Sequence, residues 1–99
     1  MEYKIIIESE AEFEIFEAAH YYENIQYNLG IDFISKVEEA ISALKTNVEA
    51  YPFIYKNIRR ILIKRFPYGI FYTVHEDNIK ILAVFHQKRK PIDWNSRLT

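Results

Sequence analysis

Histidines, arginines and lysines are the residues of this 99-residue chain whose types could do chemistry. His86 stands within three residues of both Lys88 and Arg89. A neutral imidazole can act as a general base, and neighbouring cations can stabilise the negative charge of a phosphorane. His86, with Arg65, Lys88 and Arg89, therefore has the residue types needed for metal-free cleavage of RNA. The alternative is a histidine that packs at a sheet edge beside a partner protein.

The histidines do not predict a metal site. His20, His75 and His86 are far apart in the sequence, and only the last two could meet across a hairpin. A third ligand would have to come from Glu76 or Asp77, in an expected turn, and this spacing matches no standard site. The sequence has no cysteine, no glycine-rich phosphate loop and no serine nucleophile elbow. We therefore expect no metal and no cofactor.

Most of these cations lie in one run of the chain, from residue 59 to residue 89. The run contains three segments dense in Ile, Val, Phe and Tyr. Turn signals separate them, first Pro67 with Gly69 and then residues 76–78. This pattern predicts a three-stranded antiparallel meander.

The aromatic residues of this run are expected to be mainly core, with helices covering one face of the meander. Alternation would place Ile70 and Tyr72 on one face and Phe71 on the other. The pairs Arg59–Arg60 and Lys64–Arg65 are not explained in this way, since buried guanidinium groups are rare without partners. Each pair should place one cation on each face, within reach of a binding partner.

The first half of the chain predicts one strand and two helices. Residues 3–7 are rich in isoleucine, which is typical of a strand. Apolar residues then recur at helical spacing from Ile15 to Leu29 and from Ile34 to Val48, with Gly30 as the expected cap that ends the first helix. The helices should form an antiparallel hairpin on the sheet. We therefore expect an α+β fold of order β-α-α-β-β-β, as one domain over residues 1–99.

Two stretches lack a clear period. Residues 46–57 are expected to be an aromatic connector, because Pro52 breaks the helical pattern. Residues 90–97 are expected to be a tail with a helical turn at its end.

Charge is divided unequally between the two halves. Residues 1–49 hold three basic and eleven acidic residues, a balance of −8, and residues 50–99 hold ten basic and three acidic residues, a balance of +7, which together give the net charge of −1. This division predicts an acidic helical side and a basic sheet side that suits phosphates or an acidic protein. Two ordinary solvated faces are the alternative.

Composition excludes several classes of protein. A hydrophobic content of 49% is too high for intrinsic disorder. The longest apolar runs are too short to span a membrane, and the acid at position 2 is unlike a signal peptide. We expect a cytoplasmic protein.

In their order and spacing, several segments resemble the RelE/ParE superfamily of bacterial toxin–antitoxin toxins. The resemblance covers nearly the whole chain and is most specific in the second half. It implies the β-α-α-β-β-β fold and a small toxin neutralised by an antitoxin whose helix and strand wrap its surface. The segments that carry it are Ala18–Tyr22, Gly30–Phe33, Val37–Ile41, Tyr51–Pro52, Ile58–Arg60, Arg65–Tyr72, Ile81–Pro91 and Trp94.

The resemblance implies one of two activities. Toxins of the RelE branch cut mRNA in the ribosome with Arg, Lys and a C-terminal Tyr or His, whereas those of the ParE branch inhibit DNA gyrase and have no known chemistry. Gly69 stands where the RelE branch has a cleavage-assisting Arg. Trp94 stands where it has the Tyr, and an indole cannot transfer a hydroxyl proton. These departures favour the ParE branch. Against this, His86 could still act in acid–base chemistry and Lys88 could still bind phosphate.

The leading hypothesis is therefore a ParE-like toxin, not an enzyme, that inhibits gyrase, arrests growth, stabilises plasmids and forms a hetero-oligomer with its antitoxin. The residues expected to contact the target or antitoxin are Arg59, Arg60, Lys64, Lys88 and Trp94. The alternative is a metal-independent endoribonuclease that acts on mRNA in the ribosome, with His86, Arg65 and Arg89 as catalytic residues. A third possibility is an inactive toxin kept as an antitoxin-binding partner.

Overall fold

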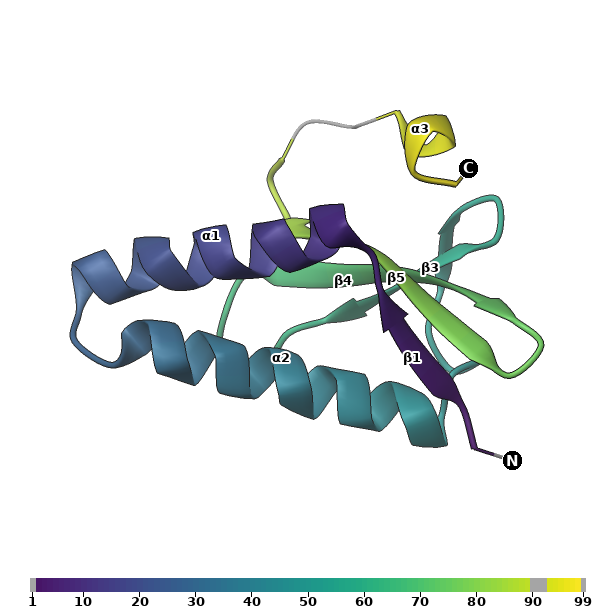
Figure 1. The fold of residues 1–99 in the computed structure, drawn as a ribbon, viewed down its shortest axis with the longest axis horizontal. Helices are drawn as coiled ribbons and strands as arrows, with labels where there is room; N and C mark the ends of the chain where they lie inside the picture. Colours follow the sequence, from purple (N-terminus) through teal and green to yellow (C-terminus); the bar gives the residue numbers. More distant parts are fainter. Residues whose placement is uncertain (1, 90–92, 99) are drawn as a thin grey trace.

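The computed structural model describes residues 2–89 and 93–98. A strand, β1 (Lys4–Ile7), leads into two long helices, α1 (Ser9–Ile25) and α2 (Leu29–Thr46) (Figure 1). The remaining elements are four strands and a short helix: β2 (Phe53–Tyr55), β3 (Ile58–Leu62), β4 (Tyr68–His75), β5 (Asn78–His86) and α3 (Trp94–Leu98).

The strands form one sheet of order β1-β5-β4-β3-β2. Strands β2 to β5 pair antiparallel with their sequence neighbours, which confirms the predicted meander over β3, β4 and β5. Strand β1 joins the other side of β5 in parallel. The two helices form a hairpin against one face of the sheet (Figure 1), so the predicted α+β class is confirmed.

The expected connector between α2 and the meander contains a strand. Phe53 pairs with Arg59 and Tyr55 with Ile58, with an irregularity between the two pairs. The expected aromatic connector therefore contains an edge strand, β2, that the sequence analysis did not predict. A three-residue edge strand is too short to show alternation in the sequence. Residues 90–92, where the tail was expected to begin, lie outside the described residues, while α3 supplies the expected helical turn.

Gly30 does not end α1, contrary to the sequence-based expectation. The turn between the helices is made at Asn28, with φ 69°, and Gly30 is the second residue of α2. A Cβ atom at Gly30 would lie 2.5 Å from the carbonyl oxygen of Ala19 in α1. The glycine therefore permits close contact of the helices. The carboxylate of Glu23 accepts hydrogen bonds from the amides of Asn28 and Gly30, which satisfies donors at the start of α2.

Each face of the sheet has its own apolar cluster. Ile70 and Tyr72 of β4 lie on the helical face in one core with Phe33 and Leu44 of α2, whereas Phe71 belongs to a second cluster on the other face, as alternation predicts. The second cluster is completed by Trp94 and Leu98 of α3 and contains Ile58, Leu82 and Ala83. None of the helices in the described part of the chain is long and apolar enough to cross a membrane.

Candidate functional site

Strand β3 has an edge that β2 covers only in part. The amide of Arg60 donates to the carbonyl of Pro52 at 3.2 Å, so this residue faces β2. The amide of Ile63 donates to the carbonyl of Tyr68 at 2.9 Å, so this residue faces β4. Because successive residues direct their backbone groups to opposite sides, Leu62 directs its amide and carbonyl outward, beyond the end of β2. This open edge can accept another strand.

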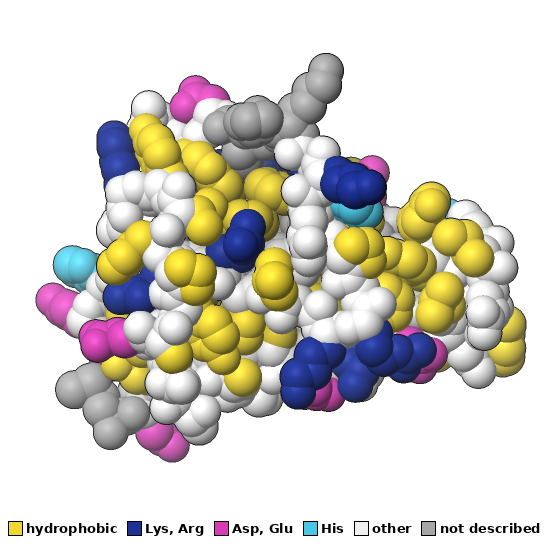
Figure 2. Space-filling view, turned by 180° about the vertical axis from the view of Figure 1, so that it is seen from behind, with side chains coloured by type: hydrophobic (Ala, Val, Ile, Leu, Met, Phe, Trp, Pro, Cys, Tyr) yellow, Lys and Arg dark blue, Asp and Glu magenta, His cyan; other side chains and the backbone are white. Residues whose placement is uncertain are grey.

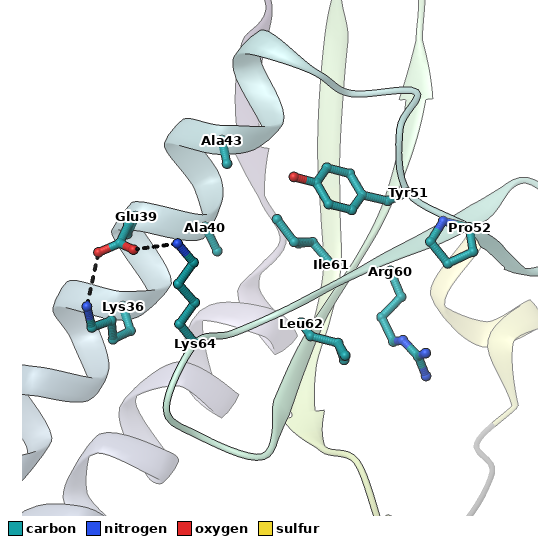
Figure 3. A pocket seen from close by; sticks show the side chains of 10 residues that line it. All are labelled: Lys36, Glu39, Ala40, Ala43, Tyr51, Pro52, Arg60, Ile61, Leu62 and Lys64. Atoms are coloured by element: carbon teal, nitrogen blue, oxygen red, sulfur yellow. Dashed lines mark hydrogen bonds and ion pairs between the residues drawn. The ribbon is translucent and has the colours of Figure 1, made fainter.

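A groove of about 430 Å³ runs between α2 and this open edge. Its floor is apolar, with alanines from α2 and Ile61 from β3. Figure 3 shows Ile61 and Tyr51 on the helical side of β3 and Arg60 and Leu62 on the other side. We call this feature the β3 groove; it is lined by Lys36, Glu39, Ala40, Ala43, Tyr51, Pro52, Arg60, Ile61, Leu62 and Lys64.

The β3 groove carries an excess of positive charge. Lys36 and Lys64 both approach Glu39, at 3.2 and 3.7 Å (Figure 3). The hydrogen bond and charge of Lys36, followed by Lys64, hold the pKa of Glu39 below its ordinary value. Arg60 is the third cation, and its Nε is buried without a hydrogen-bond partner among the described residues. Its stem lies over Gly69, where a Cβ atom would come within 3.1 Å of the Arg60 Cδ.

Hydrogen bonds to three backbone carbonyls hold the segment that brings Tyr51 to the β3 groove. The hydroxyl of Tyr72 donates to the carbonyl of Val48 at 2.7 Å, and burial raises the pKa of Tyr72 to about 12. The guanidinium of Arg59 donates to the carbonyls of Glu49 and Tyr51 at 3.0 and 2.6 Å. Arg59, expected to contact a partner, therefore already uses hydrogen-bonding capacity inside the chain.

The other residues expected to contact a partner lie in different environments. Strand β3 ends at Leu62, so Lys64 and Arg65 lie in the connection to β4, and the expectation of one on each face of a strand is wrong for this pair. The Lys64 side chain is 79% exposed at the rim of the β3 groove, and Lys88 is also exposed. Trp94 is half-buried, and its ring lies 5.1 Å from that of Phe71 in the second apolar cluster.

The residues expected to catalyse RNA cleavage are only partly brought together. His86 and Arg89 line the same hollow, of about 690 Å³, between α1 and the end of β5, but Arg65 is not among its lining residues. The Nδ1 of His86 accepts a hydrogen bond from the Lys88 amide at 3.0 Å. Arg89 forms an ion pair with Glu14 at 2.8 Å, so a carboxylate already neutralises it.

The acidic and basic halves of the chain meet in ion pairs. Lys80 of β5 lies 3.3 Å from Glu8, beside the start of α1. Arg97 of α3 lies 2.8 Å from Glu10 and 3.1 Å from Glu14, both in α1. The molecule seen from behind has hydrophobic side chains with isolated cations between them, and cations and acids together at one edge (Figure 2). The expected separation into an acidic side and a basic side is therefore wrong at these contacts.

Comparisons with known proteins agree with the architecture. A solved structure titled "Chromosomal ParDE TA system from P. aeruginosa" matches with a TM-score of 0.72 at 16% identity, over 85% of this chain and 95% of that chain. At this identity the match shows the fold alone. Comparison with curated proteins gave no match. The family described as "ParE toxin of type II toxin-antitoxin system, parDE" matches residues 5–91. Since this match spans most of the sequence, the chain belongs to the ParE toxin family, the branch of the RelE/ParE superfamily that the sequence favours.

Proposed function

We propose that this chain is a toxin that inhibits DNA gyrase in the cytoplasm and is neutralised by a cognate antitoxin bound at the β3 groove. The observation that carries the proposal is the match of the ParE toxin family over residues 5–91. The similar solved structure comes from a ParDE toxin–antitoxin system, which supports a partner protein for this chain. In such a pair, the toxin would arrest growth when the antitoxin is lost, and could thereby stabilise a plasmid.

The β3 groove has the properties of a protein-binding surface. It combines an apolar floor, an open strand edge and charged residues at its rim. Leu62, one of its lining residues, is 48% exposed. A peptide that covers this region would bury apolar surface and add main-chain hydrogen bonds at the same time. Arg60 and Lys64 are the cations placed to contact such a partner, whereas Arg59 positions the groove and Trp94 packs α3.

Purified toxin tests the proposed target directly. In a supercoiling assay with purified gyrase and relaxed plasmid, the free toxin should inhibit supercoiling. A cognate antitoxin should restore supercoiling when added at equal concentration. The control is toxin that has been mixed with antitoxin before gyrase is added. Full supercoiling in the presence of free, folded toxin would contradict gyrase as the target, and expression without growth arrest would indicate an inactive toxin.

Cleavage of mRNA is the second candidate, because His86 and Arg89 line one hollow. The wild-type toxin, the His86→Ala variant and a matched His75→Ala variant should be added to a translating extract. His75 is exposed at the β4–β5 turn and serves as the control. Our proposal expects intact mRNA with all three proteins. If mRNA were cut by the wild type and His75→Ala but not by His86→Ala, the nuclease would replace the gyrase inhibitor.

A further inference from the structure

We infer that two copies of this chain form a symmetric dimer by antiparallel pairing of their β1 strands. The order β1-β5-β4-β3-β2 pairs β1 with β5 on one side and makes its other side an edge of the sheet. This edge lies at the opposite end of the sheet from β3, so the dimer would keep both β3 grooves away from the interface. The inference goes beyond the proposed function, because it concerns how the chain associates with itself.

The backbone groups at the free side of β1 belong to Ile5 and Ile7. The amides of Lys4 and Glu8 donate to backbone carbonyls on the β5 side, at 2.8 and 3.0 Å, so these two residues face β5. Because successive residues direct their backbone groups to opposite sides, Ile5 and Ile7 direct theirs outward. In an antiparallel pair of β1 strands, Ile5 of one copy can therefore lie opposite Ile7 of the other and exchange both backbone hydrogen bonds with it.

This register gives the exposed side chains of β1 complementary neighbours. Ile6 is 36% exposed and would meet Ile6 of the second copy at the two-fold axis, on the face away from the helices. Lys4 would lie opposite Glu8 of the second copy on that same face, and the symmetry repeats this pair. Ile7, which is 38% exposed, would contact Ile5 of the second copy on the helical face. Opposite charges and β-branched side chains that lie directly opposite stabilise antiparallel strands.

Charge selects this register and this partner. The neighbouring registers with the same backbone pairing would place Lys4 or Glu8 opposite Ile6, which forms no ion pair. Glu8 already pairs with Lys80 of its own chain at 3.3 Å, but its side chain is 41% exposed and can contact a second lysine. A strand that carries a lysine and a glutamate at equal distances from its centre is complementary to itself. The two-fold axis closes the assembly, so association should stop at the dimer.

Sedimentation velocity of the purified chain tests self-association. Over about 1–500 μM the wild type should pass from monomer to dimer, because two short strands bury little area and bind weakly. Ile6→Lys would oppose two ammonium groups at the axis and should raise the dissociation constant of the dimer by at least about tenfold. Leu62→Lys makes a similar change at an exposed residue of β3 and should leave the dissociation constant within about twofold, because the site is distant from β1.

A pair of complementary variants tests the register. Lys4→Glu would oppose carboxylates on both sides of the axis, and Glu8→Lys would oppose ammonium groups. Each variant alone should therefore associate at least about tenfold more weakly than the wild type. An equimolar mixture of the two restores opposite charges at both positions of the mixed dimer, so the mixture should recover association. Thermal unfolding checks that each variant is folded.

Amide hydrogen exchange locates the contact. Exchange of the Ile7 amide should slow by at least about tenfold from the lowest to the highest concentration, whereas exchange of the Leu62 amide at the open edge of β3 should not change. The inference is wrong if the chain stays monomeric, if the mixed variants associate no better than each alone, or if the dimer leaves the Ile7 amide unprotected. Protection of Ile7 that requires added antitoxin would assign this edge to another partner and would also overturn the inference. Inhibition of gyrase is measured separately, so the proposed function would stand in each case.

Discussion

The contacts of Arg97 hold α3 against the rest of the molecule. The Arg97→Gln substitution should therefore detach that helix without unfolding the domain. Its Nη1 donates to the carbonyl of Leu82 at 3.0 Å, and its Nη2 lies 3.1 Å from Glu14. Its Nε lies 2.8 Å from Glu10. Burial lowers the pKa of Arg97, but the hydrogen bond and charge of Glu14, with Glu10, raise it overall. The guanidinium therefore remains charged in this contact.

The free-energy cost of the substitution depends on how buried the ion pair is and on which contacts Glu14 keeps. The side chains of Arg97 and Glu14 are only 11% and 12% exposed, and breaking a buried pair costs about 3–5 kcal/mol. Glu14 would keep Arg89 at 2.8 Å and the Val84 amide at 3.0 Å, so we expect a smaller cost, about 2–3 kcal/mol. A helix of one turn cannot persist alone in water. The detached population should therefore rise by about 30- to 150-fold.

The fluorescence of Trp94 provides the assay, because Trp94 is the only tryptophan of the chain and its ring packs against those of Phe71 and Phe85. In the Arg97→Gln variant, acrylamide should quench its fluorescence more strongly, while the amides of β3 and β4 keep their protection from hydrogen exchange. Arg65→Gln, with the same change of charge at an exposed position, should behave as the wild type. Unchanged quenching in Arg97→Gln would refute the reasoning, as would loss of amide protection throughout the sheet.

Three further changes test how the fold is held together. Gly30→Ala should destabilise the domain by about 1–3 kcal/mol in urea, because its Cβ atom would lie 2.5 Å from the Ala19 carbonyl oxygen; unchanged stability would contradict the close helix contact. Tyr72→Phe should cost about 1–3 kcal/mol, because the Val48 carbonyl loses its buried donor. Since burial raises the pKa of Tyr72 from 10.0 to about 12, stability that depends on its protonated hydroxyl is complete below pH 10 and lost as the pH rises through 12. The wild type should therefore lose more stability than Tyr72→Phe in urea titrations across this range, and equal losses would rule out that linkage. Phe16→Ser should change the free energy of unfolding by less than about 0.5 kcal/mol, because Phe16 is 61% exposed; a larger loss would show that it packs in the core.

Local patterns in the sequence were sufficient to predict the main helices and strands of the fold. The two helices follow from apolar residues at helical spacing, and the meander follows from β-branched segments separated by turn residues. Alternation separated Tyr72 from Phe71, and the structure then places Tyr72 in the core beneath the helices and Phe71 on the opposite face. Gly30 was misassigned because a glycine that caps a helix and one that permits close helix contact look the same in a sequence.

The candidate site could be predicted only in part. The sequence selected Arg60 and Lys64 from their residue types, and both line the β3 groove. It did not find Tyr51 and Ala43 as lining residues, because their side chains meet only when α2 packs beside β3. It could not show that Arg59 donates to backbone carbonyls before β2, because β2 was not visible as a strand.

The sequence by itself determined the α+β class, the family and the residue types available for binding, since these depend on local periodicity and on motifs in order along the chain. Only the tertiary structure decided which cations are free. Arg89 forms an ion pair with Glu14 and Arg97 forms ion pairs with Glu10 and Glu14, acids far away in the sequence, whereas Arg60 lies beside an open strand edge. The reason is that a charge is neutralised by whatever lies within a few ångströms, and folding sets those distances.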